Sequence, residues 1–220
     1  MNIEIFEVEQ NAPEWAVLRC GIPTASCFDK VLAKPRKGHE AEGSKTRKDY
    51  MYQLADEAIY HDPVESYSNA NMERGHLLEA EARDIYQLHN EVLAQQVGFV
   101  RNHTVRAGCS PDSLIGTEGI LEIKTSFPRL WISHLLAGSY PIEHKPQVQG
   151  ALWITGRQWC DLMLYWPKRR PLIVRVERDE AYIKELSDAV GKFNVELDHL
   201  VAALRTKLDL KGTLEKVAAE

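Results

Sequence analysis

Apolar positions recur at helical spacing in three long stretches of the chain. One stretch follows Ser44, a second runs from about Asn71 to His89, and a third occupies the last forty residues. Spacing of i, i+3, i+4 and i+7 places such residues along one side of a helix, where they can pack on a core. We therefore predict a long helix in each stretch. The closing helix carries these apolar side chains: Tyr182, Leu186, Val190, Phe193, Leu197, Leu200, Val201 and Leu204.

Shorter elements account for the rest of the pattern. The segments from Thr24 to Ala33 and from Pro146 to Trp153 are typical of short helices, with Thr24 at an N-cap. The centre of the chain and the segment after it contain short runs rich in β-branched and apolar residues, separated by turn residues. We predict strands over these runs: Val97–Arg101, Thr104–Ala107, Gly119–Thr125, Cys160–Tyr165 and Leu172–Glu177.

The order of these elements indicates the fold class. Helices before, between and after a small group of strands are typical of an α/β or α+β fold, in which a small central mixed β-sheet is flanked by helices. No internal repeat, low-complexity tract or long linker divides the sequence. We therefore expect one domain over residues 1–220.

The composition is that of a chain that can form a packed core. The 220 residues include 44% hydrophobic and 27% charged residues, which excludes disordered, collagen-like and fibrous classes. No stretch approaches the roughly 18 apolar residues that span a bilayer, and the N-terminus lacks the pattern of a secretion signal. We expect a cytoplasmic protein without a membrane partner. Four cysteines with no C-x-x-C pair predict reduced thiols, not a zinc site or disulfides.

Charge is distributed unevenly along the chain. The 27 basic and 32 acidic residues give a net charge of −5, which argues against a broad basic surface that coats nucleic acid. Three local basic clusters nevertheless occur, at residues 34–37, 45–48 and 168–170. Taken alone, each cluster is more typical of a solvated loop or helix face than of a nucleic-acid contact.

The candidate chemistry lies between residues 109 and 124. On a strand, alternate side chains share a face, so Glu122 and Lys124 point together, away from their apolar neighbours. If Asp112 ends the neighbouring strand of a hairpin, a second carboxylate joins them. Two carboxylates beside one lysine require a cation to be stable together. Hard oxygen ligands favour Mg²⁺ or Mn²⁺ over zinc.

The spacing of these charged residues matches a nuclease motif. Pro111-Asp112 is separated by nine residues from Glu122-x-Lys124, on a predicted hairpin. This arrangement resembles the PD-(D/E)xK motif. The resemblance implies a metal-dependent nuclease with a restriction-endonuclease-like core.

Further motifs over most of the chain indicate which family of nucleases the sequence resembles. They occur in this order: Trp15, Leu18-Arg19, Gly21, Thr24-Ala25-Ser26, Ala33-Lys34-Pro35-Arg36, Gly75 with Glu79, Ala82-Arg83, Cys109-Ser110-Pro111-Asp112, Leu121-Glu122 with Lys124, and Gln147-Val148-Gln149 before Trp153. Their order and spacing resemble the phage lambda exonuclease family, which is also the YqaJ-like viral recombinase family. The resemblance extends from about Trp15 to Asp179.

The resemblance implies a set of metal ligands. Asp112, Glu122 and the main-chain carbonyl of Ile123 match metal-binding positions of the family. Glu79 matches a carboxylate that helps to hold a second ion. We therefore expect two Mg²⁺ ions as cofactors, which Mn²⁺ can replace.

Two further residues match groups that act on the attacking water. Lys124 matches the lysine that orients or activates this water and offsets charge in the transition state. Gln147 matches a glutamine that positions the same water. One departure concerns Asn102, seven residues before Cys109, where the family has an aspartate. The resemblance therefore leaves the effect of this position on metal affinity open.

Other matches imply contacts with DNA. Arg19, Ser26 and Ser110 correspond to a pocket for the 5′-phosphate of the digested strand, and arginine with small hydroxyls suits phosphate oxygens. Arg129 lies one residue out of register with a further arginine of that pocket. A wedge that separates the two strands is implied at two positions: Arg36 and Met72.

The resemblance also implies an activity and partners. It implies an Mg²⁺-dependent 5′-to-3′ exonuclease that acts on the ends of linear double-stranded DNA. Such an enzyme releases 5′-mononucleotides and leaves 3′ single-stranded tails for phage-type homologous recombination by strand annealing. The family further implies a homotrimer ring around the DNA, a single-strand annealing protein as partner, and a phage or prophage protein in a bacterial host.

Two alternatives remain open at this level. One is a PD-(D/E)xK endonuclease or repair nuclease of another family, although the sequence has no cysteine cluster for an iron–sulfur group. The other is a non-catalytic module that binds DNA ends, against which the intact Asp112, Glu122 and Lys124 argue. Linear and circular duplexes distinguish the three, because an exonuclease digests only linear DNA, an endonuclease nicks the circle, and a binding module does neither.

Overall fold

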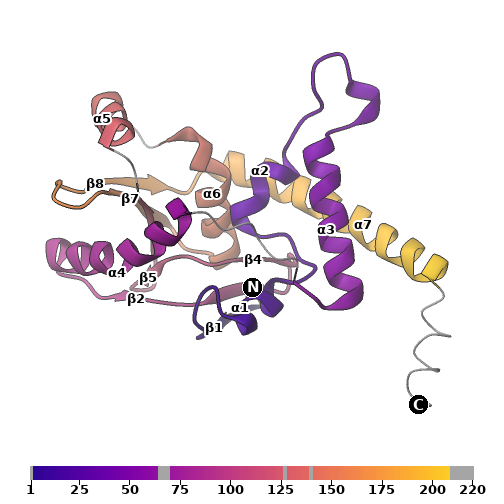
Figure 1. Ribbon diagram of the computed structural model, residues 1–220, viewed down its shortest axis with the longest axis horizontal. Helices are drawn as coiled ribbons and strands as arrows, with labels where there is room; N and C mark the ends of the chain where they lie inside the picture. Colours follow the sequence, from indigo (N-terminus) through magenta and orange to yellow (C-terminus); the bar gives the residue numbers. More distant parts are fainter. Residues whose placement is uncertain (1, 64–69, 126–127, 139–140, 209–220) are drawn as a thin grey trace.

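The protein is described by a computed structural model that covers residues 2–63, 70–125, 128–138 and 141–208 (Figure 1). The strands are β1 (Ile3–Phe6), β2 (Ala94–Gln95), β3 (Phe99–Asn102), β4 (Ala107–Cys109), β5 (Ser113–Ile115), β6 (Gly119–Thr125), β7 (Trp159–Tyr165) and β8 (Leu172–Glu177). The α-helices are α1 (Pro13–Arg19), α2 (Phe28–Val31), α3 (Lys45–Tyr60), α4 (Ala70–Asn90), α5 (Pro128–Ala137), α6 (Lys145–Thr155) and α7 (Glu180–Leu208). Single 3₁₀ turns occupy Ala25–Cys27, Glu40–Glu42 and Ile142–His144.

Two sheets organise these elements. The larger sheet has the strand order β2-β5-β6-β7-β8, and only its central pair, β6 and β7, is parallel. The smaller sheet is antiparallel, with the order β1-β3-β4. Helices surround both sheets (Figure 1). This arrangement confirms the predicted α/β class with a small mixed sheet flanked by helices.

The central strand β6 divides the core into two parts. Ile120 belongs to the larger apolar cluster, which includes buried residues of α2, α3, α6 and α7. Leu121 and Ile123 belong to the smaller cluster, where they pack with Ala82 and Tyr86 of α4. Alternation along the strand therefore sends successive side chains to opposite faces, as the sequence pattern predicts. Both faces of β6 are covered by helices.

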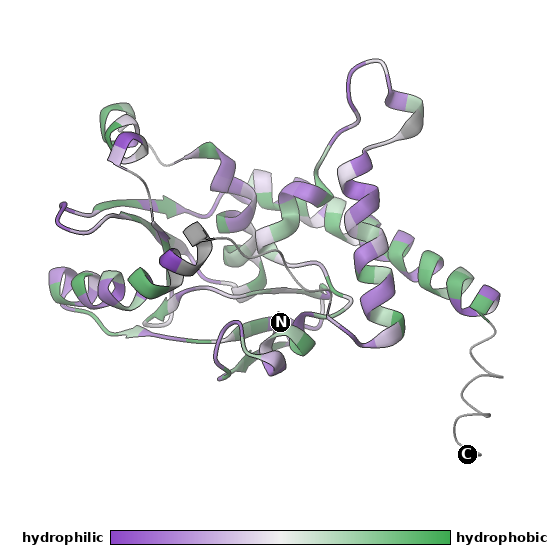
Figure 2. Ribbon diagram, in the orientation of Figure 1, coloured by the Kyte–Doolittle hydropathy of each residue, from purple (hydrophilic) through white to green (hydrophobic). Residues whose placement is uncertain are grey.

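The long predicted helices are confirmed as α3, α4 and α7, and the segment opened by Pro146 is α6. Ser44 caps α3, since its hydroxyl accepts a hydrogen bond from the Arg47 amide at 3.3 Å. Hydrophilic and hydrophobic residues alternate in bands along α7 (Figure 2), as expected for a helix that packs by one face. No helix among the described residues is long and apolar enough to cross a membrane. The cysteines are free thiols, as expected.

Two sequence expectations require correction. The strand predicted over Thr104–Ala107 is wrong for Thr104–Arg106, which turn the chain between β3 and β4 with Arg106 at a left-handed φ of 51°, whereas Ala107 begins β4. The helix predicted over Thr24–Ala33 is interrupted, and consists of the Ala25–Cys27 turn followed by the four residues of α2. Sequence reasoning also missed β1 and α5, which are too short or too apolar throughout to show a clear period.

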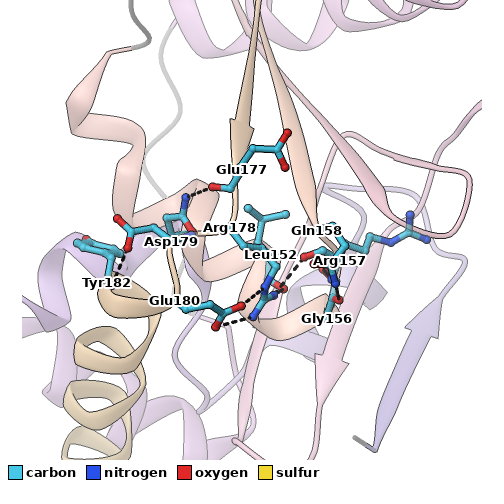
Figure 3. A network of polar contacts seen from close by, with 11 residues as sticks. Leu152, Gly156, Arg157, Gln158, Glu177, Arg178, Asp179, Glu180 and Tyr182 are labelled. Carbon is cyan, nitrogen blue, oxygen red and sulfur yellow. Dashed lines mark hydrogen bonds and ion pairs between the residues drawn. The ribbon is translucent and has the colours of Figure 1, made fainter.

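A polar network joins α6 to the start of α7 (Figure 3). Gln149, which is buried in α6, donates to the Glu177 carbonyl at 2.9 Å and accepts from the Asp179 amide at 2.9 Å. Arg178 donates to the Leu152 carbonyl at 2.7 Å and pairs with Glu180 at 2.7 Å. These bonds satisfy main-chain groups at the end of the sheet. They also fix the position of α6, which carries Gln147.

The close packing of α6 yields a stability prediction. A Cβ added at Gly150 would lie 2.4 Å from a ring atom of Phe28, whereas a Cβ at Gly191 in α7 would meet nothing within 4 Å. We expect Gly150→Ala to lower the free energy of unfolding by about 1–3 kcal/mol through overpacking. The matched control Gly191→Ala should raise it by up to about 1 kcal/mol, because alanine favours the helix. Urea denaturation measures both, and equal stabilisation by the two variants would contradict this packing.

Candidate active site

The β5–β6 hairpin brings the two predicted carboxylates together. Pro111 separates β4 from β5, and Gly116, at a φ of 49°, lies in the turn that joins β5 to β6. In the antiparallel register Ser113 pairs with Leu121, so one further step places Asp112 opposite Glu122. A carboxylate oxygen of Asp112 accepts a hydrogen bond from the main-chain amide of Ile123. The hypothesis that Asp112 ends the neighbouring strand of a hairpin is therefore confirmed.

Glu122 is the centre of a set of short polar contacts. Its side chain lies on the face shared with Lys124, whose Nζ donates to Glu122 Oε1 at 2.8 Å. Gln147, in the first turn of α6, donates from Nε2 to the same oxygen. Asp112 and Glu122 are 8% and 4% exposed, so both carboxylates are almost removed from water. The predicted trio and Gln147 thus form one cluster, in which the two carboxylates are buried and Lys124 and Gln147 are half-buried.

The cluster carries more negative than positive charge. Burial raises the pKa of Asp112 well above its usual range, and the nearby Glu122 and Glu79 raise it further. Burial alone would lower the pKa of Lys124, but Glu122 and Asp112 outweigh it and the pKa is raised. A divalent cation would stabilise the ionised form of a carboxyl whose pKa is raised by burial and by nearby carboxylates.

Glu79 reaches this cluster from α4. Its side chain is half-buried and acts electrostatically on both Asp112 and Lys124. The helix is held against the sheet by two side-chain bonds, from Arg83 Nε to Ser113 Oγ at 3.0 Å and from Tyr86 to Asp161 at 2.7 Å. The structure thus places Glu79 within electrostatic range of the cluster, and its role as a metal ligand stays a prediction.

The donor set fits a hard divalent cation. It offers two carboxylates and, because the amide and carbonyl of one strand residue point to the same side, the Ile123 carbonyl faces the segment that carries Asp112. All are oxygen donors, as Mg²⁺ prefers. Within the described residues, no three His, Cys, Asp or Glu side chains form a complete metal cage by themselves.

Arg19 of α1 and Ser110 form a second cluster. It adjoins the first cluster along the chain, because Ser110 precedes Asp112 by two residues. Arg19 Nη1 donates to Ser110 Oγ at 3.3 Å, and the guanidinium stacks on the Trp15 ring, 4.1 Å from its centroid. Trp15 Nε1 donates to the same hydroxyl at 2.9 Å. Burial lowers the pKa of Arg19, and no ion pair of the described chain involves this residue. The cluster is a half-buried cation surrounded by hydroxyls, which suits an anion such as phosphate.

Thr24 links Ser26 to this pocket, and the sequence reasoning gave Thr24 no role in binding. Thr24 was predicted as an N-cap, and although it precedes the Ala25–Cys27 turn, its side chain makes no capping bond. Its hydroxyl lies 3.5 Å from Arg19 Nη2 and 3.3 Å from Ser26 Oγ. Trp15 was also left without a role, although the spacing of four residues between Trp15 and Arg19 on one helix could have indicated their stacking.

The remaining predicted contacts lie apart from these clusters. Arg129 is exposed at the start of α5, and no described contact joins it to Arg19, Ser26 or Ser110. Arg36 is exposed in the connection between α2 and α3, which projects from the body of the protein (Figure 1). The side chain of Met72 lies outside the described residues. The structure therefore leaves Arg129 and the wedge pair as predictions.

Asn102 has a structural role away from the carboxylates. It is 1% exposed, donates to the Ile154 carbonyl at the end of α6 at 3.0 Å and accepts from the Thr104 amide at 3.1 Å. An aspartate could accept from Thr104 but, when ionised, could not donate to Ile154. The presence of asparagine where the family has an aspartate therefore affects the contact between β3 and α6.

This fold and this pair of clusters define a class of protein. A mixed sheet with a carboxylate–lysine site on its central hairpin, next to a cationic pocket, is the nuclease core that the sequence predicts. The family follows from comparison: the model of the YqaJ-like viral recombinase domain matches residues 14–158, and the chain belongs to this family. The predicted resemblance is thereby confirmed.

Solved structures agree with this assignment. The crystal structure of an alkaline exonuclease, LHK-Exo from Laribacter hongkongensis, is 30% identical with a TM-score of 0.78, and the match covers 90% of this chain and 98% of that chain. The structure of LHK-Exo in complex with dAMP is 31% identical with a TM-score of 0.79 and the same coverage. A phage-related exonuclease from Haemophilus somnus 129PT, at 17% identity, TM-score 0.59 and coverage of 86% and 99%, shares the fold. No curated protein sequence matches significantly.

The charge imbalance at Asp112 yields a prediction for the metal-free protein. A carboxyl whose pKa is raised by folding contributes stability that is present below its unfolded pKa and is lost as the pH rises through its folded pKa. At pH 8 without a cation, Asp112→Asn should therefore stabilise the protein by about 1–3 kcal/mol, or about 2–4 °C in melting temperature per kcal/mol.

Thermal melts in EDTA and in Mg²⁺ measure this effect. Mg²⁺ should raise the melting temperature of the parent protein and leave that of Asp112→Asn nearly unchanged. The control Asp198→Asn removes an exposed carboxylate paired with Arg106 at 2.6 Å, and should destabilise by at most about 1 kcal/mol. An Asp112→Asn variant that melts below the parent in EDTA would contradict the proposed repulsion.

Proposed function

We propose that this protein is an Mg²⁺-dependent 5′-to-3′ exonuclease on linear double-stranded DNA. The observation that supports this most is the placement of Asp112 opposite Glu122, with Lys124 and Gln147 bonded to Glu122. Its family and its similarity to alkaline exonucleases support a DNA exonuclease. The ion, the polarity and the role in recombination are parts of the proposal.

The residues of the cluster would have separate roles in phosphodiester hydrolysis. Asp112, Glu122, the Ile123 carbonyl and Glu79 would hold two Mg²⁺ ions, for which Mn²⁺ can substitute. When bound, the ions supply Lewis-acid activation of water and of the phosphoryl oxygens. The protein's own contribution is a fixed arrangement of donors and acceptors that needs no rearrangement during reaction.

Lys124 and Gln147 have different tasks in this proposal. Because its carboxylate neighbours raise its pKa, Lys124 stays protonated at neutral pH, and it therefore acts as a donor to charge developing on the phosphate. Gln147 donates from Nε2 to Glu122, which leaves its Oε1 able to accept a hydrogen bond from the attacking water. Both side chains donate to the same oxygen of Glu122, so they would hold the reacting groups next to this carboxylate.

The polarity of digestion rests on the Arg19 pocket. Ser110 Oγ accepts bonds from Trp15 and Arg19, so its own hydrogen is available to a phosphate oxygen. A terminal 5′-phosphate held there by Arg19, Ser110 and Ser26 would align the adjacent phosphodiester with Asp112, which follows Ser110 by two residues. Arg129 would complete the pocket when DNA is bound.

Strand separation and partners extend the proposal beyond the described contacts. Arg36 on the projecting connection, together with Met72, would separate the two strands ahead of the carboxylates. Release of 5′-mononucleotides would then leave a 3′ single-stranded tail for a strand-annealing protein. A homotrimer ring would keep the enzyme on the DNA.

Digestion of linear and circular duplexes tests the activity. We expect mononucleotides from linear DNA in Mg²⁺ and no nicking of a closed circle. Lys124→Ala should slow hydrolysis by about 10²–10³-fold with little change in DNA binding, since its interaction forms mainly in the transition state. Lys192→Ala, an exposed lysine of α7, is the matched control. Nicking of the circle would favour an endonuclease, and turnover by Lys124→Ala at the parental rate would refute its role.

The end preference tests the polarity. A duplex with a 5′-phosphate should be digested faster than one with a 5′-hydroxyl, because only the former gives Arg19 a dianion to bind. Arg19→Ala should remove most of this preference by slowing only the phosphorylated substrate. Arg106→Ala, which breaks an exposed ion pair with Asp198, should leave it intact. If Arg19→Ala still favoured the 5′-phosphate as strongly as the parent, the pocket would have another function.

A further inference from the structure

The turn between β7 and β8 carries three positive charges that the proposed mechanism does not use. Lys168, Arg169 and Arg170, here named the basic turn, are all exposed. The turn lies at the free end of the β7–β8 hairpin and is hydrophilic (Figures 1 and 2). None of the ion pairs or hydrogen bonds described for this chain uses their side chains. On a protein with a net charge of −5, this is a local concentration of available positive charge.

The basic turn is held in a defined conformation. The Arg169 amide donates to the Trp166 carbonyl at 3.2 Å, which closes the turn. Arg74 of α4 stacks on Trp166, with its guanidinium 4.8 Å from a ring centroid. Lys168 has a φ of 63°, a left-handed conformation that glycine or asparagine adopts with less strain. A lysine therefore occupies a position where the backbone conformation favours a smaller, uncharged residue.

The strand register places the basic turn at the same end of the sheet as the carboxylate cluster. In the parallel pair β6 and β7, Lys124 lies beside Leu164, and Thr125 lies beside Tyr165. Lys168 follows Leu164 by four residues, so it extends at most about 13 Å beyond the level of Lys124. This is about four base steps of a DNA duplex, at 3.4 Å per step along each strand. A substrate seated on the carboxylates can therefore reach the turn.

We propose that the basic turn binds the phosphate backbone of the DNA substrate a few nucleotides from the scissile phosphate. The inference rests on the proposed function, since it takes DNA as the substrate of the same site. The turn offers charge without an open aromatic platform, because Trp166 is half-buried and one face of its ring is covered by Arg74. The contact is therefore electrostatic and independent of base sequence, and it secures the substrate without taking part in hydrolysis.

The salt dependence of binding tests this contact. The probes are a blunt 30-base-pair duplex with 5′-phosphates and a single strand of equal length, both bound in EDTA and followed by fluorescence anisotropy. The variant Lys168→Asn/Arg169→Gln/Arg170→Gln should reduce the slope of log K against log salt by about 2–3 for duplex, at roughly 0.9 per lost phosphate contact. Lys168→Asn alone should reduce it by about 1 and keep the melting temperature, because asparagine suits the left-handed backbone.

A variant with the same change in net charge provides the control. Lys184→Gln/Lys192→Gln/Lys207→Gln alters three exposed lysines of α7 and should leave the slope unchanged. A reduced slope for duplex alone assigns the contact to double-stranded DNA, and a reduced slope for the single strand alone assigns it to a separated strand. An unchanged slope with both probes, or an equal change in the α7 variant, overturns the proposal. Failure of the parent to digest linear DNA would instead refute the proposed function, because binding in EDTA requires no hydrolysis.

Discussion

The structure depends on one electrostatic constraint, which is the placement of two acidic side chains opposite each other at the buried end of a hairpin. Asp112 and Glu122 are nearly inaccessible to water, and the nearby Lys124 only partly offsets the rise in the pKa of Asp112. Like charges at directly opposite positions of an antiparallel pair destabilise a sheet. The cost is consistent with a site that a divalent cation completes.

The rest of the fold keeps this pair in place. Helix α4 is bonded through Arg83 to Ser113, the residue next to Asp112. Helix α6 supplies Gln147 to Glu122 and is itself fixed by the bonds of Gln149 to the β8–α7 connection. The two helices cover opposite faces of the sheet, so the carboxylates cannot move apart without disturbing both parts of the core. Rigid support of this kind is what precise positioning of reacting groups requires.

The two functional clusters share one short segment of chain. Ser110 closes the Arg19 pocket, and Asp112 begins the carboxylate cluster, with only Pro111 between them. Ser110, Pro111 and Asp112 connect β4 to β5, so the chain passes from the smaller sheet to the larger sheet within these three residues. A phosphate held by the first cluster therefore has a fixed relation to the second cluster. If the proposed function holds, this coupling would allow a single core to select a strand end.

Much of this arrangement could be predicted from the sequence. Alternation along β6 predicts that Glu122 and Lys124 share a face, and helical periodicity predicts α3, α4 and α7. The stacking of Arg19 on Trp15 and the distance from the basic turn to Lys124 depend on tertiary packing, which no local pattern contains. The turn at Thr104–Arg106 was predicted as part of a strand because its composition is β-leaning, whereas the left-handed conformation of Arg106 reverses the chain. Asn102 likewise shows its role only through its contact with Ile154.

Location of the cation tests the central claim most directly. Crystals of the protein soaked in Mn²⁺ give an anomalous difference map in which a bound ion is identified by its own scattering. We expect a peak between Asp112 and Glu122, within about 2.0–2.3 Å of an oxygen of each, at distances typical of hard cations. An empty space between the two carboxylates at a Mn²⁺ concentration that supports DNA digestion, or a peak that lies elsewhere on the protein, would contradict the account.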